Sequence, residues 1–170
     1  MPDGRLAKGA ARRRDILDAV LRLIGREGLG AVTQRRVADE AGVPASAVLY
    51  YFASVDAVLV TALREVNDRY VADLATVRDL ADLARLLADS AARDRAGLAA
   101  EYDLFLLAAR RDDLRAELER WDAVLASLCA RLVPGREAVL VAVVNGLYLQ
   151  ATLTGLDEAG ALAVLEAAAR

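Results

Sequence analysis

The sequence predicts an all-α protein, because helix-forming residues dominate it, proline is rare and apolar residues recur every three or four positions. Hydrophobic residues make up 56% of the 170 residues, and Ala and Leu are the commonest of them. Ala and Leu are strong helix formers, whereas proline, which breaks helices, occurs only at positions 2, 44 and 134. The length suits one compact domain, or a small module joined to a larger one.

The first helix is expected after a short polar segment. Residues 1–10 contain glycine and charged side chains, so a flexible basic tail is predicted there. Ile16 and Val20 belong to an apolar face that recurs at helical spacing through 11–27, opposite a charged face. Gly28 follows directly, as glycine commonly does past the C-terminus of a helix.

Two short helices separated by a glycine come next, at 33–40 and 44–50. The Thr33 hydroxyl is a good N-cap for the first, and Pro44 suits the start of the second because an N–H there would have no partner. Gly42 supplies the tight turn between them. Packed on the preceding helix, this pair has the geometry of a helix-turn-helix, whose second helix enters the DNA major groove.

The rest of the chain predicts further helices with short connections. Ser54 is an N-cap for a longer helix to about Ala75, with Asp56 favourably placed in its first turn. The remaining expected helices are 79–93, 96–110, 113–132, 136–154 and 157–169. The predicted domains are a helix-turn-helix DNA-binding domain, 11–53, and a helical ligand-binding and dimerisation domain, 54–170.

Charge is distributed unevenly along the chain, although the net charge is only −3. Residues 1–36 hold nine Lys or Arg and four Asp or Glu, whereas residues 57–170 hold thirteen and eighteen. A basic N-terminus on an acidic body suggests that one end binds a polyanion, and the alternative is a solvated basic tail.

Several other classes of protein are not expected. Histidine is absent and Cys129 is the only cysteine, so we predict no metal, no cofactor and no internal disulfide, in a reducing cytoplasm. The longest apolar run, 138–144, is far below the ~20 residues that span a bilayer, so a soluble protein without a membrane partner is expected. Carboxylates are scattered and Lys8 is the only lysine, so nothing selects the residues of an enzyme. An all-helical interaction adaptor without DNA binding is the alternative function.

Residues 11–60 resemble the TetR family of bacterial regulators (TetR/AcrR-like). The match follows the family's order and spacing at Arg14-Asp15-Ile16-Leu17-Asp18-Ala19, Gly28, Thr33, Val37-Ala38, Ala41-Gly42-Val43, Tyr51-Phe52, Ser54, Asp56 and Leu59. The resemblance implies a ligand-responsive regulator that acts as a repressor. Such a protein binds palindromic operator DNA as a homodimer and is released by a small hydrophobic effector.

The resemblance also implies a DNA-binding surface. Thr33 and neighbouring amides would bind a phosphate at a helix N-terminus, as would Tyr51, while Arg35 or Arg36 would reach a phosphate or a base edge. The full expected set is Arg12, Arg13, Arg14, Thr33, Arg35, Arg36, Pro44, Ala45, Ser46, Ala47, Leu49, Tyr50 and Tyr51. The sequence departs from the family's usual residues at Pro44, Leu49 and Val55.

The predicted recognition helix contains no Arg, Lys, Asn or Gln, so bidentate hydrogen bonds from it to bases are not expected. Specificity would depend instead on apolar contacts to thymine methyl groups, on Arg35 and Arg36, and on DNA shape.

The last long helices carry the expected dimer interface. Residues 113–132 form one apolar stripe, and residues 137–153 are apolar on nearly every side, which suggests cover from a second subunit or, alternatively, a central core helix. The expected interface residues are Leu118, Trp121, Leu125, Leu128, Leu140, Val144, Leu147 and Tyr148.

A ligand pocket is expected among the aromatic residues of the second domain, with ordinary core packing as the alternative. Its candidate residues are Tyr102, Phe105, Leu106, Arg110 and Trp121. Their largely apolar character suggests an uncharged or weakly polar hydrophobic ligand.

Overall fold

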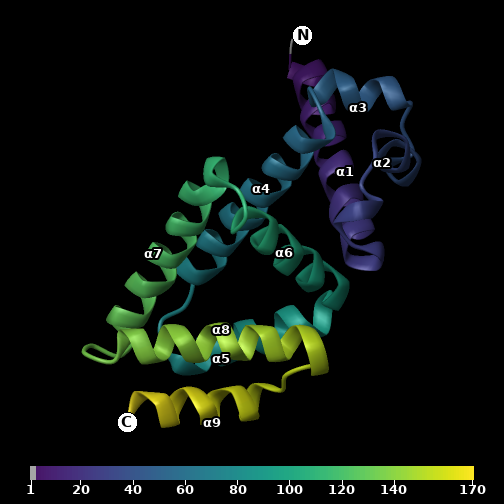
Figure 1. Cartoon of the computed structure of the whole chain (residues 1–170). Coiled ribbons are helices and arrows are strands. Elements are labelled where there is room, and N and C mark those ends of the chain that lie inside the picture. Colours follow the sequence, from purple (N-terminus) through teal and green to yellow (C-terminus); the bar gives the residue numbers. More distant parts are fainter. Residues whose placement is uncertain (1–2) are drawn as a thin grey trace.

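The computed structural model describes residues 3–170, with side chains from residue 7 onwards except at positions 91 and 93. Across that range the chain forms α-helices and two short 3-10 helices, so the all-α prediction is confirmed. The α-helices are α1 (Asp3–Glu27), α2 (Gln34–Ala41), α3 (Ala45–Tyr51), α4 (Val55–Ala75), α5 (Leu80–Arg93), α6 (Arg95–Ala108), α7 (Arg115–Leu132), α8 (Glu137–Thr154) and α9 (Glu158–Ala169). Helices α1–α3 form one end of the molecule, and α4 connects them to a body in which α5, α8 and α9 lie side by side (Figure 1).

Local capping signals set most helix boundaries. Thr33 Oγ1 accepts a hydrogen bond from the Arg36 N–H at 3.3 Å, and Ser54 Oγ accepts one from the Ala57 N–H at 3.0 Å. Gly42 ends α2 with a φ of 63°, a left-handed conformation that suits a residue without Cβ. These three predictions are confirmed.

The start of α1 differs from the predicted one. The helix begins at Asp3, so it includes most of the segment 1–10 that was expected to be a flexible tail; residues 1 and 2 of that tail lie outside the described residues. Ala, Lys and Arg, which dominate 7–14, are good helix formers, so the helix propagates backwards from the part of α1 that is packed.

The molecule has two hydrophobic cores, which meet at α4 and α6. The first joins α1–α3 to the N-terminal half of α4 and to one face of α6, through residues such as Val66 and Leu104. The second joins α5, α7, α8 and α9, and it takes Leu74 from α4 and Leu98 from α6. Helices α4 and α6 therefore belong to both cores, and the half-buried Tyr70 of α4 packs against each of them.

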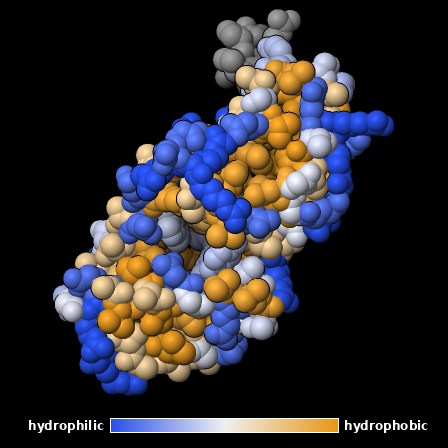
Figure 2. Space-filling view, in the orientation of Figure 1, coloured by the Kyte–Doolittle hydropathy of each residue, from blue (hydrophilic) through white to orange (hydrophobic). Residues whose placement is uncertain are grey.

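Helix α8 is the most apolar long helix of the body. By length and composition alone, α8 is long and apolar enough to cross a membrane, a property that core helices of soluble proteins share. Here α8 packs against α5, α6, α7 and α9. Its outer side and that of α9 bring apolar residues to the surface at the lower end of the molecule (Figure 2).

Candidate functional site

The second helix of the helix-turn-helix presents a small, mostly uncharged surface. Val48 is buried and anchors α3, while Leu49 and Tyr50 are 51% and 82% exposed. Gln34 Nε2 of α2 donates a hydrogen bond to the carbonyl oxygen of Ala45 at 3.0 Å, which fixes the two helices relative to each other. The surface of α3 can therefore offer apolar and hydroxyl groups to a DNA groove, and no formal charge.

Groups that suit phosphate binding lie beside α3. The half-buried Tyr51 packs edge-on against Tyr50, with ring centroids 5.0 Å apart. Tyr51 also lines a shallow groove with Lys8 and Arg12 of α1. Thr33 is exposed at the N-terminus of α2, where backbone N–H groups favour an anion.

The two arginines of α2 differ in their surroundings. Arg36 donates a hydrogen bond to Glu27 Oε1 at 2.5 Å, so its guanidinium already has a partner within the protein. The Arg35 side chain is 90% exposed, and its contact with Asp39 is a long one of 3.9 Å. Arg35 is therefore the freer of the two cations to contact DNA.

The other predicted DNA-binding residues take varied positions. Arg12, Arg13 and Arg14 lie on the exposed side of α1, and Arg13 stacks over the Phe52 ring at 5.3 Å. Pro44 is the N-cap of α3, where Ala45 and Ser46 are exposed. Ala47 instead packs partly against the first core.

An aromatic cleft of about 450 Å³ opens between α6, α7 and α8. Three predicted pocket residues, Tyr102, Phe105 and Trp121, line it, and the Phe105 and Trp121 rings lie 5.7 Å apart. The remaining lining comes from Leu118, Asn145, Gly146, Tyr148 and Leu149. Leu106 and Arg110 do not line this cleft: Leu106 is a 53% exposed residue of α6, and Arg110 is exposed in the turn just after that helix.

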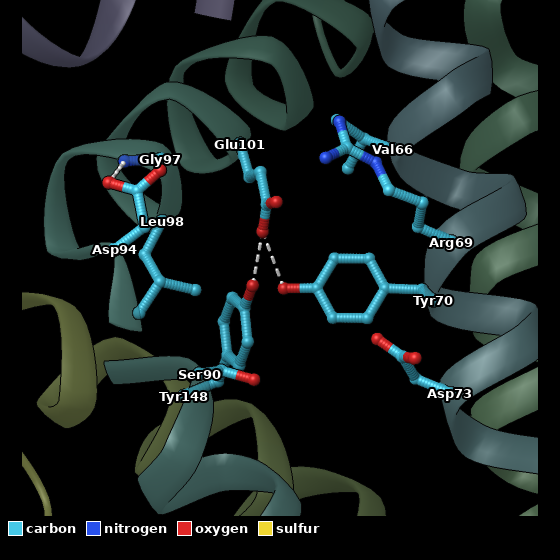
Figure 3. Close-up of a pocket in the computed structure, with 10 residues that line it drawn as sticks. All are labelled: Val66, Arg69, Tyr70, Asp73, Ser90, Asp94, Gly97, Leu98, Glu101 and Tyr148. Carbon is cyan, nitrogen blue, oxygen red and sulfur yellow. Dashed lines mark hydrogen bonds between the residues drawn. The ribbon is translucent and has the colours of Figure 1, made fainter. Parts of the chain in front are cut away.

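A second cavity, of about 220 Å³, lies between α4, α5, α6 and α8. Glu101 Oε2 accepts hydrogen bonds there from the hydroxyls of Tyr70, at 2.7 Å, and Tyr148 (Figure 3). Burial raises the pKa of Glu101 to about 7 and raises that of the Tyr148 hydroxyl. Burial also raises the pKa of Tyr102 to about 12.

Sequence reasoning did not include Glu101 and Tyr70 in the pocket and assigned Tyr148 to the dimer interface. The three residues come from three helices, so no local spacing brings them together. The one available signal was a glutamate among apolar residues in 98–108, on a helix otherwise suited to packing.

The structure places most of the predicted dimer-interface residues inside the protomer. Leu118 and Trp121 are partly buried at the cleft, and the second core contains Leu125, Leu128, Leu140, Val144, Leu147 and Tyr148. These six side chains already pack on neighbouring helices, so they are not free to meet a partner. The apolar residues that α8 and α9 leave exposed are different ones, including Val139, Leu149, Leu153 and Val164.

An exposed α3 on a capped α2–α3 turn, joined to a helical body with a cleft, defines a helix-turn-helix transcriptional regulator. Residues 16–62 match the family described as "Bacterial regulatory proteins, tetR family", and residues 75–170 match "Tetracyclin repressor-like, C-terminal domain". The chain belongs to the TetR family of transcriptional regulators, which are not enzymes.

The similar proteins include transcriptional regulators and a multidrug binding protein. A TetR-family member from Streptomyces coelicolor, SCO1917, is 36% identical with a TM-score of 0.79, covering 92% of this chain and 97% of that one. The multidrug binding protein EbrR complexed with malachite green is also 36% identical, with a TM-score of 0.74 and the same coverages. The transcriptional regulator BetI of Cronobacter sakazakii is 28% identical over 163 residues, 85% of this chain and 81% of BetI.

Proposed function

We propose that this regulator is a cytoplasmic, homodimeric repressor that binds palindromic operator DNA and is released by a small aromatic effector. Residues 11–53 would form the DNA-binding domain, and residues 54–170 the domain that binds the effector and the second subunit. The observation that carries the proposal is that α4 and α6 belong to both hydrophobic cores and also wall the cavity. Occupation of the cavity therefore acts on the helices that support α1–α3.

The operator would be recognised largely through shape and apolar contacts. Leu49 and Tyr50 are the most exposed large side chains of α3, and they suit thymine methyl groups and sugar edges. Arg35, on the neighbouring α2, supplies an exposed cation whose contact with Asp39 is a long one of 3.9 Å. Thr33 and Tyr51 would hold phosphates and so set the position of α3 in the groove.

A second subunit would pack on the outer faces of α8 and α9. Exposed small and apolar residues lie there: Val139, Ala142, Gly146, Leu149 and Leu153 on α8, with Ala163, Val164 and Ala167 on α9. Of these, Gly146 and Leu149 also line the aromatic cleft, so the second subunit would lie next to the effector. Small side chains allow two helix pairs to approach closely, and burial removes apolar area from water. A two-fold dimer would then carry its two α3 helices to half-sites about one DNA turn, ~34 Å, apart.

The effector would bind in the aromatic cleft and the adjoining cavity. EbrR, which is 36% identical to this chain, has been crystallised as a multidrug binding protein with malachite green, proflavin and ethidium. All three are flat polycyclic or triaryl dyes, and the Phe105 and Trp121 rings of the cleft suit such molecules. The effector shifts the protein between two states only by its difference in affinity for them.

Two connections would carry that shift to the DNA-binding helices. Arg111, just after α6, contacts Asp56 in the first turn of α4 and so joins the cleft side of the body to the base of α1–α3. Close packing of α6 on α1 is the second connection.

DNA binding is tested by sequencing the DNA that co-purifies with the protein and measuring affinity for a labelled fragment by fluorescence anisotropy. We expect steep salt dependence, and loss of preference over scrambled DNA in a Leu49→Ala/Tyr50→Ala variant. Leu106→Ala is the matched control, since Leu106 is also exposed but lies on α6. No preference in the wild type would support the interaction-adaptor alternative.

Release and dimerisation need separate measurements. Malachite green is expected to lower the anisotropy of the complex, after correction for its effect on DNA alone. Light scattering should report a dimer for the wild type and a monomer for Leu153→Glu, because a charge on the α8 face would be buried at the interface. Leu106→Glu should remain dimeric, and a monomeric wild type at micromolar concentration would contradict the dimer.

A further inference from the structure

Asn67 is a buried amide on a helix that otherwise buries apolar side chains. It is 1% exposed, and it is the only polar residue among the buried side chains that the structure describes. It lies near the middle of α4, between Val66 in the first core and Leu74 in the second. A polar group in such a place normally forms hydrogen bonds, so its partners indicate what it does.

The Asn67 amide holds α4 to the main chain of α7. Its Nδ2 donates hydrogen bonds to the carbonyl oxygen of Glu117 and to Glu117 Oε2, each at 3.1 Å. In an α-helix that carbonyl also accepts from the N–H four residues later, which here belongs to Trp121. Leu118 and Trp121 both line the aromatic cleft. The amide therefore contacts the turn of α7 that forms one wall of the cleft.

Two further polar contacts between α4 and α7 lie at the surface. Arg64 pairs with Glu117 at 3.0 Å, and the Arg64 side chain is 59% exposed. Asp68 pairs with Arg120 at 2.5 Å, and the Asp68 side chain is 65% exposed. Exposed ion pairs contribute little free energy, because water screens them. The buried Asn67 amide is therefore the polar contact that specifies how α4 is seated on α7.

The same amide adds little to the stability of the fold, because only half of it is paired. Asn67 Oδ1 is buried and accepts no hydrogen bond from the described residues. An unpaired buried acceptor costs free energy, which offsets the hydrogen bonds that Nδ2 makes. Sliding or turning α4 on α7 would leave Nδ2 unpaired as well, so the amide fixes the alignment of the two helices.

We propose that Asn67 is a positioning residue that couples the aromatic cleft to the DNA-binding helices through α7. An effector that displaces Leu118 and Trp121 moves the turn of α7 to which the amide is bonded, and α4 moves with that turn. This third connection rests on the proposed function of the cleft. It differs from the two connections that run through α6, because it involves neither Arg111 nor the packing of α6 on α1.

The test measures how strongly effector and operator binding are linked, with malachite green as the probe. In the wild type, malachite green should raise the operator Kd roughly 5-fold to 150-fold, and operator should raise the malachite green Kd by the same factor. Asn67→Leu replaces the amide by an apolar group with the same branching. The variant should bind operator alone and malachite green alone, but the linkage factor should fall at least about threefold. The connections through α6 account for the linkage that remains.

Stability measurements separate this role from general damage. The free energy of unfolding of Asn67→Leu in urea should equal or exceed that of the wild type, because the variant removes the unpaired Oδ1 together with Nδ2. Asn67→Val is a second, smaller replacement and keeps the test valid if leucine overpacks the site. Asp68→Asn breaks the neighbouring exposed pair with Arg120 and should leave the linkage factor unchanged.

Hydrogen exchange without DNA distinguishes failure of this inference from failure of the proposed function. Malachite green should change amide exchange at 63–71 of α4 in the wild type, and much less in Asn67→Leu. If that stretch responds equally in both proteins, or if a folded variant keeps the wild-type linkage factor, the inference is overturned. If it responds only in the wild type while malachite green never releases the operator, the coupling through Asn67 stands and the repressor mechanism fails.

Discussion

Glu40 and Glu101 each contact two side chains from other helices, yet their surroundings shift the pKa values in opposite directions. Hydrogen bonds from Arg26 and Arg22 hold the pKa of Glu40 at about 2, and these contacts tie α1 to α2 at 2.6 and 2.8 Å. Burial beside two tyrosine hydroxyls raises the pKa of Glu101 to about 7. The DNA-binding end therefore keeps its charges at any physiological pH, whereas the cavity contains a group that can change charge.

Rigidity and response belong to different regions of this chain. Ion pairs join α1 to α2, and a shared apolar core holds α3 against them, so the three helices are suited to move as one unit. The cavity joins α4, α6 and α8 through hydrogen bonds to a single carboxyl oxygen. In the proposed mechanism, a ligand that changes those bonds would alter the positions of α4 and α6 directly.

The largest effect is expected where the two regions touch, at Gly25 of α1. A Cβ added there would lie 2.2 Å from the carbonyl oxygen of Ala96, a backbone atom of α6 that can move only with its helix. Gly25→Ala should lower the free energy of unfolding in urea by about 2–3 kcal/mol, through overpacking. Gly30→Ala is the control, because a Cβ at Gly30 meets open space. Equal stability of the two variants would show that α1 and α6 are not in close contact.

Glu101→Gln should make the empty protein more stable at pH 8. The pKa of Glu101 is raised on folding, so its contribution favours the native state below the unfolded pKa of about 4.5 and is lost as pH rises through about 7. Glu101→Gln avoids that loss. We therefore expect its free energy of unfolding at pH 8 to exceed that of the wild type by about 1–2 kcal/mol, which raises Tm by several degrees. At pH 4 the two proteins should melt together. A variant less stable than the wild type at pH 8 would mean that Glu101 is well solvated when ionised.

Variants of Arg35 and Arg36 distinguish contacts with DNA from contacts within the DNA-binding domain. Arg35→Ala should weaken operator binding about fivefold to tenfold, roughly 1 kcal/mol, because its exposed guanidinium has no close partner in the protein. Arg36→Ala should affect DNA less, since Arg36 is held by Glu27 at 2.5 Å. Fluorescence anisotropy with cognate and with scrambled DNA measures the affinity of both variants. If Arg35→Ala loses affinity equally for the two DNAs, Arg35 is a phosphate contact. A larger effect of Arg36 would reverse the assignment.

The smallest effect is expected at Glu40. Its pKa is lowered on folding, so the stability it contributes is present above pH 4.5 and is lost as pH falls towards 2. Glu40→Gln should cost less than about 1 kcal/mol at pH 7, because the two arginine side chains are about half exposed and screened by water. The difference from the wild type should shrink at pH 2.5 and in 1 M salt. A constant difference would indicate that Glu40 acts through packing.

Local features of the sequence predicted most of the fold. Thr33, Gly42 and Ser54 mark helix ends through hydrogen bonds and turns that involve only near neighbours, so the boundaries of α2 and α4 agree with the predicted ones to within a residue. The surroundings of Glu101 could not be predicted in this way, because Tyr70, Glu101 and Tyr148 lie on α4, α6 and α8 and meet only after those helices pack.

By itself, the sequence determined that the chain is helical, where most of its helices begin and end, and that Thr33 to Phe52 resembles a DNA-binding motif. Those properties depend on interactions over three or four residues. Only the tertiary structure decided which side of α8 lies in the core, that Arg36 has a close ion pair whereas that of Arg35 is long, and that the carboxyl of Glu101 faces the cavity. An apolar helix gives no indication of which face its neighbours will cover, and the pKa of a carboxyl group depends on groups distant in the chain.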